Sequence, residues 1–281
     1  MSYFRFLAIF LGIPIAVLGV LTWWDGRNGR TLPRRLSHYS PWRVLLAHIL
    51  MALIYTTPWD NYLVATGVWW YNPQLVTGLT IGWVPIEEYT FFAVQPIFTG
   101  LWLLFWLRRL PLPPLPTATS WLNHRLRHLT AGVAGGLWLI MLGVLVTGWS
   151  PGTYLSLELV WALPPILIQA IFGADIWWHY RRQIAVGLLP TTVYLVLADA
   201  VAIRLGTWTI DPQQSLGWLL GGVLPVEEMV FFLITNVLVV LGMTLVLAPE
   251  SQMRVRSWQE RLATVRLGSL GRARRSTSTR S

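Results

Sequence analysis

Two pairs of adjacent glutamates lie within long apolar stretches of the sequence. Glu87-Glu88 occurs in the segment GWVPIEEYTFF, and Glu227-Glu228 occurs in the similar segment GVLPVEEMVFF. Ionisable residues inside a membrane are costly to bury and are usually functional. Because basic residues are almost absent from these stretches, we expect at least one acid of each pair to stay protonated and able to donate a proton.

An aspartate precedes each pair in the neighbouring apolar stretch, Asp60 in the first case and Asp199 in the second. We interpret both as further catalytic candidates that converge with the glutamates in the outer half to the middle of the membrane. A cap at the membrane interface is the alternative interpretation. Arg204 is the one basic residue placed to form an ion pair with Asp199.

The geometry of a helix limits what each glutamate pair can do. Adjacent side chains point about 100° apart, so one acid can react while its neighbour holds it or faces another helix. Glu87 is about eight residues into its expected span, a depth of about 12 Å. Pro85 and Pro225 precede the pairs by two residues and are interpreted as structural elements that free a backbone carbonyl, or simply bend the helix.

Aromatic residues are concentrated around the acids and could bind a substrate through their π faces, which attract cations. For the tryptophans a belt at the membrane interface is an alternative, and for the phenylalanines core packing is. The candidates for substrate binding are Trp69, Trp83, Phe91, Phe92, Trp208, Phe231 and Phe232.

The elements that position these residues are membrane-spanning helices. Over half of the 281 residues (54%) are hydrophobic and only 12% are charged, and apolar runs long enough to cross a bilayer recur along the chain. We therefore expect an all-α integral membrane protein with about seven transmembrane helices. Span five contains Glu158 and Pro164-Pro165, which should kink or break it. The expected spans are residues 3–24, 43–66, 79–107, 130–150, 155–173, 184–204 and 216–247.

The arginines indicate how these helices are oriented. Nineteen of the 21 basic residues, all of them arginine, fall in loops 25–43, 108–129 and 174–183 and in the tail, which leaves Arg5 and Arg204 for the other face. By the positive-inside rule this predicts a multi-pass protein of the cell membrane with its N-terminus outside and its C-terminus in the cytoplasm. The net charge of +9 then reflects contact with membrane lipids, and we expect no nucleic-acid partner.

An internal repeat organises the chain. The stretch from Asp60 resembles the stretch from Asp199 at an offset of 139 residues, and the glutamate segments match at an offset of 140. Two three-helix repeats joined by one connecting helix enter the membrane in the same direction, so the repeats are parallel. The expected parts are a first repeat (1–107), a linker and connecting helix (108–154), a second repeat (155–247) and a basic, disordered cytoplasmic tail (248–281).

These motifs resemble the small membrane lycopene cyclases. The resemblance rests on TTPWDNYL from Thr56 and on Pro-x-Glu-Glu followed by Phe-Phe, which occurs twice, and it covers about residues 1–247. It implies that lycopene or a related carotene is taken from the bilayer and that its linear end groups are closed to rings by acid, without redox change. It also implies association with other carotenoid-pathway enzymes as one arrangement. The family's essential motif falls on Pro85, Glu87, Glu88, Pro225, Glu227 and Glu228.

Other chemistry finds little support in the sequence. It contains no dinucleotide fingerprint and no metal-ligand spacing of histidines, so we expect no cofactor and no metal. A retinal-binding photoreceptor would need a lysine for its Schiff base, and the chain has none. A proton-coupled membrane transporter with intramembrane carboxylates is the remaining alternative.

Reporter fusions test the orientation that the arginines predict. A reporter at Ser281 and a reporter in the segment 58–78 should be active on opposite faces of the membrane, because an odd number of spans separates the two positions. Two reporters active on the same face would show that the seven-span arrangement is wrong.

Overall fold

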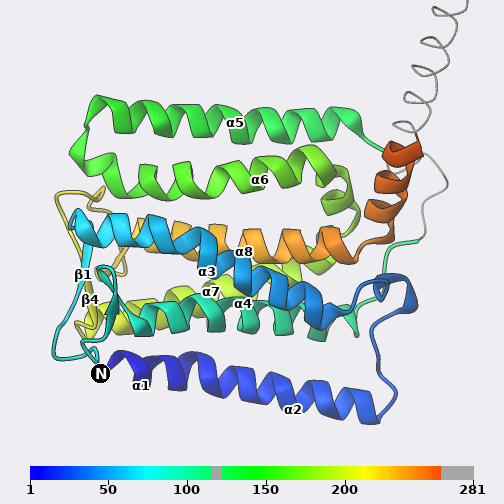
Figure 1. The fold of residues 1–281 in the computed structure, drawn as a ribbon, viewed down its shortest axis with the longest axis horizontal. Coiled ribbons are helices and arrows are strands. Elements are labelled where there is room, and N and C mark those ends of the chain that lie inside the picture. Colours follow the sequence, from blue (N-terminus) through cyan, green and yellow to red (C-terminus); the bar gives the residue numbers. More distant parts are fainter. Residues whose placement is uncertain (115–121, 261–281) are drawn as a thin grey trace, which may run out of the picture.

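The structure, a computed structural model, describes residues 1–114 and 122–260, and most of them lie in long helices packed side by side (Figure 1). The helices are α1 (Tyr3–Leu7), a π-helical turn (Ala8–Gly12), α2 (Ile13–Arg27), α3 (Pro41–Ala65), α4 (Ile86–Leu107), α5 (His124–Thr147), α6 (Thr153–His179), α7 (Arg181–Arg204) and α8 (Val226–Leu247). Short 3-10 turns occur at Arg34–Leu36 and Ser150–Gly152.

Six helices of the described chain are long and apolar enough to cross a membrane. They are the continuous helix Tyr3–Arg27, α4, α5, the helix Ser150–His179, α7 and α8. Helix α3 has 25 residues, which is long enough, but its polar residues, Arg43, His48 and Asp60 among them, keep it outside this group. The all-α membrane architecture is confirmed, whereas the count of seven spans is not.

The helices form two parallel repeats, as the sequence predicts. The first helix, α3 and α4 are followed by the connecting helix α5 and then by α6, α7 and α8 in the same order. Equivalent hydrogen bonds fix equivalent ends: the amide of Tyr3 donates to the carbonyl of Leu75 (2.8 Å), and the amide of Tyr154 donates to that of Gln214 (2.9 Å). Helix α5 packs against α6 at the edge of the bundle (Figure 1).

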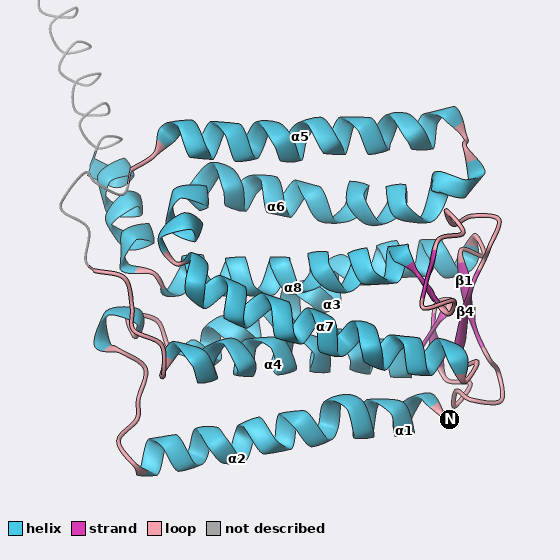
Figure 2. Cartoon of the chain, turned by 180° about the vertical axis from the view of Figure 1, so that it is seen from behind, coloured by secondary structure: helices cyan, strands magenta, loops and turns pink. Residues whose placement is uncertain are grey.

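A two-stranded antiparallel ladder joins the two repeats at one end of the bundle, where Figure 2 shows β1 and β4. Strand β1 (Trp69–Tyr71) pairs with β4 (Trp208–Ile210), and Trp70 lies opposite Thr209. These two residues are equivalent in the repeats, so the local two-fold axis passes between them. Two further hydrogen bonds continue the ladder symmetrically, from Asn72 to Thr207 and from Asp211 to Val68.

Two hairpins replace the first turns of the helices expected at 79–107 and 216–247. Strands β2 (Thr80–Ile81) and β3 (Val84–Pro85) form one hairpin, and β5 (Leu219–Leu220) and β6 (Leu224–Pro225) form the other. The reason is the glycine in each turn: Gly82 has φ +67° and Gly222 has φ +72°, which a helix does not allow. The second turn is one residue longer, which explains the change of offset from 139 to 140.

Helices α4 and α8 therefore begin directly before the glutamate pairs. Both pairs lie in the first turn of their helix, not about 12 Å into a span. Pro85 and Pro225 precede these helices with extended backbone and do not bend them, which corrects the expected kink. A proline tolerates this place because the first amides of a helix have no intrahelical partner.

Proline inside a membrane helix frees a carbonyl that lipid cannot satisfy. In the first helix Pro14 removes the partner of the Phe10 carbonyl, and the π-helical turn ends beside it. The hydroxyl of Tyr194, on α7 in the other repeat, donates a hydrogen bond to this carbonyl at 2.9 Å. The side chain of one repeat thus completes the backbone of the other.

Helix α6 shows the equivalent contact. Pro165 frees the carbonyl of Trp161, and the hydroxyl of Tyr55 on α3 donates to it at 2.8 Å. The helix continues through Pro164-Pro165, where the sequence predicts a kink or break, because side chains satisfy the freed backbone. Its backbone instead leaves helical geometry at Gly173, with φ −157° and ψ 32°.

The end of the bundle opposite the strands carries buried ion pairs. Arg109 binds both carboxylate oxygens of Asp25, at 2.7 and 2.8 Å. Arg254 binds both oxygens of Asp175, at 3.0 and 2.7 Å. Residues 249–260 are helical, so the tail expected to be disordered from residue 248 begins as a docked helix. Residues 261–281 of that tail and 115–121 of the linker lie outside the described residues.

The docked helix yields a stability prediction. Arg254→Met should lower the free energy of unfolding by about 3–5 kcal/mol, because it leaves the carboxylate of Asp175 buried without its cation. Arg256→Met, on the same helix but exposed, is the matched control and should change it by less than about 0.5 kcal/mol. Unfolding of both purified variants in detergent measures the difference. Equal stability of the two variants would contradict the structural role of this ion pair.

Candidate active site

Four carboxyl groups meet in one small cavity at the strand end of the bundle. The cavity has a volume of about 50 Å³ and is lined by residues of both repeats. Asp60 and Glu88 come from the first repeat, and Asp199 and Glu228 come from the second. None of the four is more than 8% exposed. We call this cavity the acid pocket.

Each half of the acid pocket contains the same tyrosine–glutamate contact. The hydroxyl of Tyr3 donates to Glu88 at 2.5 Å, and the hydroxyl of Tyr154 donates to Glu228 at 2.7 Å. Both tyrosines begin the first helix of their repeat, and both glutamates stand in the first turn of its last helix. A carboxylate at that place gains support from the tyrosine hydrogen bond and from the helix N-terminus.

The other glutamate of each pair faces away from the pocket, as the 100° step between neighbours requires. Glu87 accepts a hydrogen bond from the amide of Thr77 at 2.6 Å, and Glu227 accepts one from the amide of Leu216 at 2.6 Å. Neither glutamate lines the acid pocket. Each therefore holds the loop that leads into the hairpin before its own helix.

The two aspartates differ in their partners. The indole nitrogen of Trp208 donates to Asp199 at 3.0 Å. Neither oxygen of Asp60 has a hydrogen-bond partner within the described residues. Arg204, expected as a partner of Asp199, is exposed and forms no ion pair with it. Over residues 1–114 and 122–260, the ion pairs involve Asp25, Asp175 and Glu250 and none of the four pocket acids.

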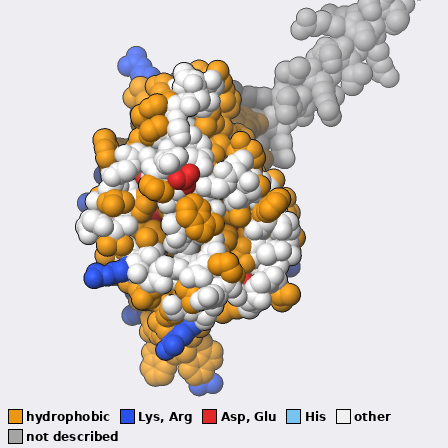
Figure 3. Space-filling view, turned by 90° about the vertical axis from the view of Figure 1, so that its left-hand side faces the viewer, with side chains coloured by type: hydrophobic (Ala, Val, Ile, Leu, Met, Phe, Trp, Pro, Cys, Tyr) orange, Lys and Arg blue, Asp and Glu red, His pale blue; other side chains and the backbone are white. Residues whose placement is uncertain are grey.

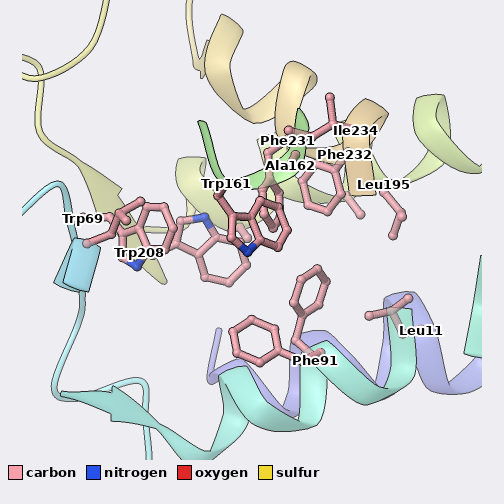
Figure 4. Packing of buried hydrophobic residues seen from close by; sticks show 14 of the residues in the cluster. Leu11, Trp69, Phe91, Trp161, Ala162, Leu195, Trp208, Phe231, Phe232 and Ile234 are labelled. Atoms are coloured by element: carbon pink, nitrogen blue, oxygen red, sulfur yellow. The ribbon is translucent and has the colours of Figure 1, made fainter. Parts of the chain in front are cut away.

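Aromatic side chains form the remaining wall of the pocket, and Figure 4 shows several of them converging from strands and helices of both repeats. The ring of Trp59 stacks on Phe231 at 6.0 Å and meets Trp69 edge-on at 5.5 Å. Burial raises the pKa of the Tyr71 hydroxyl, in strand β1 at the pocket wall, well above its usual value, so this group stays protonated.

Six of the seven aromatic residues predicted to bind substrate line the acid pocket: Trp69, Phe91, Phe92, Trp208, Phe231 and Phe232. The structure does not bring the seventh to it. Trp83 lies in the turn of the first hairpin and is 67% exposed. Seen from the strand end, the surface is mainly hydrophobic and uncharged, with basic side chains near its rim (Figure 3).

An apolar groove continues from the acid pocket into the membrane-spanning part of the bundle. It has a volume of about 390 Å³, and Phe91, Phe92 and Phe231 line both spaces. On the side of α3 it reaches the exterior at Met51 and Ile54, which are 62% and 75% exposed. We call it the lipid-facing groove.

Sequence reasoning missed the two tyrosines that bind the pocket glutamates. Tyrosines at the start of apolar spans are common at membrane interfaces, so neither stood out. A shared spacing could have found them: Tyr3 precedes Pro14 by eleven residues, and Tyr154 precedes Pro165 by eleven. Trp59 was missed for a similar reason, although it directly precedes Asp60.

Comparison with known proteins relates this geometry to one family. The family described as "Lycopene cyclase" matches residues 31–106 and 151–246, which fall in the two repeats. No solved structure matches the chain.

Individual relatives agree with this match. A protein of Halobacterium salinarum named "Lycopene beta-cyclase" is 37% identical over 246 residues, which cover 87% of this chain and 95% of that protein. A protein of Podospora anserina named "Bifunctional lycopene cyclase/phytoene synthase" is 36% identical over 199 residues, 69% of this chain and 33% of that protein. A protein of the same name from Phaffia rhodozyma is 36% identical over 214 residues, 70% of this chain and 31% of that protein.

Proposed function

This chain belongs to the lycopene cyclase family, and we propose that it closes the linear end groups of lycopene, or a related carotene, to ionone rings in the acid pocket. One observation carries the proposal: four buried carboxyl groups, none paired with a cation in the described residues, face one cavity walled by aromatic rings. Such a cavity suits a reaction that begins with a proton and passes through a carbocation.

The reaction needs no electron acceptor. A carboxylic acid transfers its proton to the terminal carbon–carbon double bond, whose π electrons form the new C–H bond and leave a tertiary cation. A second double bond of the same end group attacks this cation and closes the ring. A carboxylate then removes a proton from the ring, and the remaining electrons form a double bond. One proton enters and one leaves, so the carotene is isomerised without oxidation or reduction.

Glu88 and Glu228 are the proposed acid and base, because they face the cavity and each keeps a tyrosine hydrogen bond that stabilises a carboxylate. Asp60 and Asp199 add to the acidic wall from the opposite helices. Glu87 and Glu227 are proposed to position the loops and not to react. The aromatic rings exclude water and attract the cation, which would otherwise be captured by a nucleophile.

The lipid-facing groove offers a place for the rest of the substrate. Only one end of a linear carotene can occupy the acid pocket at a time, and the long hydrocarbon chain behind it needs apolar surroundings. From Asp60 to His48, which lines the groove, α3 rises about 18 Å. The opening at Met51 and Ile54 supports uptake of the carotene directly from the bilayer.

The orientation follows from the charges at the two ends. We place the strand end and the N-terminus outside and the arginine-rich end and C-terminus in the cytoplasm, because cytoplasmic loops of membrane proteins carry the excess of arginine. A hydrocarbon substrate and product that stay within the bilayer also favour association with other carotenoid-pathway enzymes in the same membrane.

Glutamate-to-glutamine variants test the function. Glu88→Gln and Glu228→Gln keep the shape of the side chain but cannot transfer a proton, so each should lower the rate of ring formation by about 10²- to 10⁴-fold. Glu87→Gln and Glu227→Gln are the matched controls, because the amide oxygen still accepts the loop hydrogen bond. They should keep most of the activity. Pigment analysis in a lycopene-accumulating host measures all four, and wild-type yields from Glu88→Gln and Glu228→Gln would rule out the proposed site.

A bulky substitution tests the lipid-facing groove. Ala52→Trp should fill the groove beside the acid pocket and raise KM for lycopene about tenfold or more, because the hydrocarbon chain loses its apolar contact. Leu50→Trp, at a 50% exposed position of α3 outside the groove, should leave KM unchanged. Kinetics with lycopene in lipid nanodiscs give the comparison. An Ala52→Trp variant with wild-type KM would mean that the hydrocarbon chain lies elsewhere.

A further inference from the structure

Glu158 is a buried acid that the proposed reaction does not use. It lies on α6, one helical turn after Tyr154, and is 0% exposed. Neither of its oxygens has a hydrogen-bond partner among the residues that the structure describes, and it forms no ion pair there. A carboxylate without a cation is costly in such surroundings, so Glu158 is stable there as the uncharged acid.

Glu158 also breaks the symmetry of the acid pocket. Tyr3 and Tyr154 are equivalent, since each donates to the pocket glutamate of its own repeat. Four residues after Tyr3 stands Leu7, which is 4% exposed, and four residues after Tyr154 stands Glu158. A leucine fills this place in the first repeat, so packing alone does not require an acid in the second.

The extra acid extends a chain of polar groups behind Glu228. The Tyr154 hydroxyl gives its proton to the hydrogen bond with Glu228, and its oxygen can accept another. Residues four apart share one face of a helix, and the Glu158 carboxyl interacts with this hydroxyl. An uncharged Glu158 has an O–H group to donate. Donation to Tyr154 strengthens the bond that Tyr154 donates in turn.

We propose that Glu158 is a positioning residue that, acting through Tyr154, makes Glu228 the proton donor of the acid pocket and leaves Glu88 as the proton acceptor. This inference rests on the function proposed above. In the first repeat, Leu7 offers Tyr3 no donor, so the carboxylate of Glu88 is supported by one hydrogen bond that nothing strengthens from behind. The two halves are thereby assigned different tasks.

The proton count of this cycle closes. The O–H bond of Glu228 breaks, its proton joins the terminal alkene, and the carboxylate left behind is stabilised by the Tyr154–Glu158 chain. After ring closure, Glu88 takes the proton that leaves the ring. Transfer of that proton from Glu88 to Glu228 across the pocket restores the starting state. Tyr154 and Glu158 keep their own protons throughout.

Substitutions at Glu158 test the proposal in purified enzyme with lycopene. Glu158→Leu copies the first repeat and is expected to fold. It should lower kcat by about 10- to 100-fold with KM unchanged, because only the developing charge on Glu228 loses support. Glu158→Gln, whose amide N–H can still donate to Tyr154, should recover part of the loss.

A double-mutant cycle separates this role from packing. In a Tyr154→Phe background, Glu158→Leu should change kcat by less than about twofold, since the connecting hydroxyl is gone. In a Tyr3→Phe background it should keep its full effect. Wild-type kcat in Glu158→Leu, no recovery in Glu158→Gln, or a full effect without the Tyr154 hydroxyl would each overturn the proposal.

Failure of this inference can be told from failure of the proposed function. If Glu228→Gln forms rings at the wild-type rate, the acid pocket is not the reaction site. If Glu228→Gln is inactive while Glu158→Leu has wild-type kcat, the site stands and only the role of Glu158 is wrong.

Discussion

A carboxyl group buried in a membrane protein must meet a cation or keep its proton, and the two ends of this bundle use the two solutions. At the arginine-rich end, Asp25 and Asp175 each meet an arginine that binds both oxygens. At the strand end, the acids meet tyrosine hydroxyls, an indole nitrogen and backbone amides, all of them neutral donors. The first solution anchors helices, whereas the second leaves protons available for chemistry.

The backbone satisfies the same requirement by local means. Lipid offers no hydrogen bonds, so the hairpins before α4 and α8 and the ladder between β1 and β4 pair the irregular backbone near the acid pocket. The hairpins also allow the helices to begin at the glutamates. Each pair then sits at the positive end of a helix, where a carboxylate is tolerated after its proton has gone.

The sequence was most informative where the repeat doubled the signal. The glutamate pairs, the two aspartates and the parallel order of helices follow from matching residues at two places. The hairpins could not be predicted in the same way, since their two-residue strands are as apolar as the helices they precede and only a glycine marks each turn. Tyr3 and Tyr154 were hidden because their role depends on contacts across 85 and 74 residues of chain. The difference between Leu7 and Glu158 becomes visible only after the tyrosines are superposed.

The exchanged tyrosine contacts bear on how the protein is made. The carbonyl of Phe10 in the first helix is completed by Tyr194, which follows 184 residues later. During synthesis this helix enters the bilayer long before its partner exists. The carbonyl of Trp161 finds the opposite situation, since Tyr55 has already been inserted when α6 arrives. The second repeat can therefore assemble on a finished surface of the first, while the first helix of the chain reaches its final position only after α7 has entered the membrane.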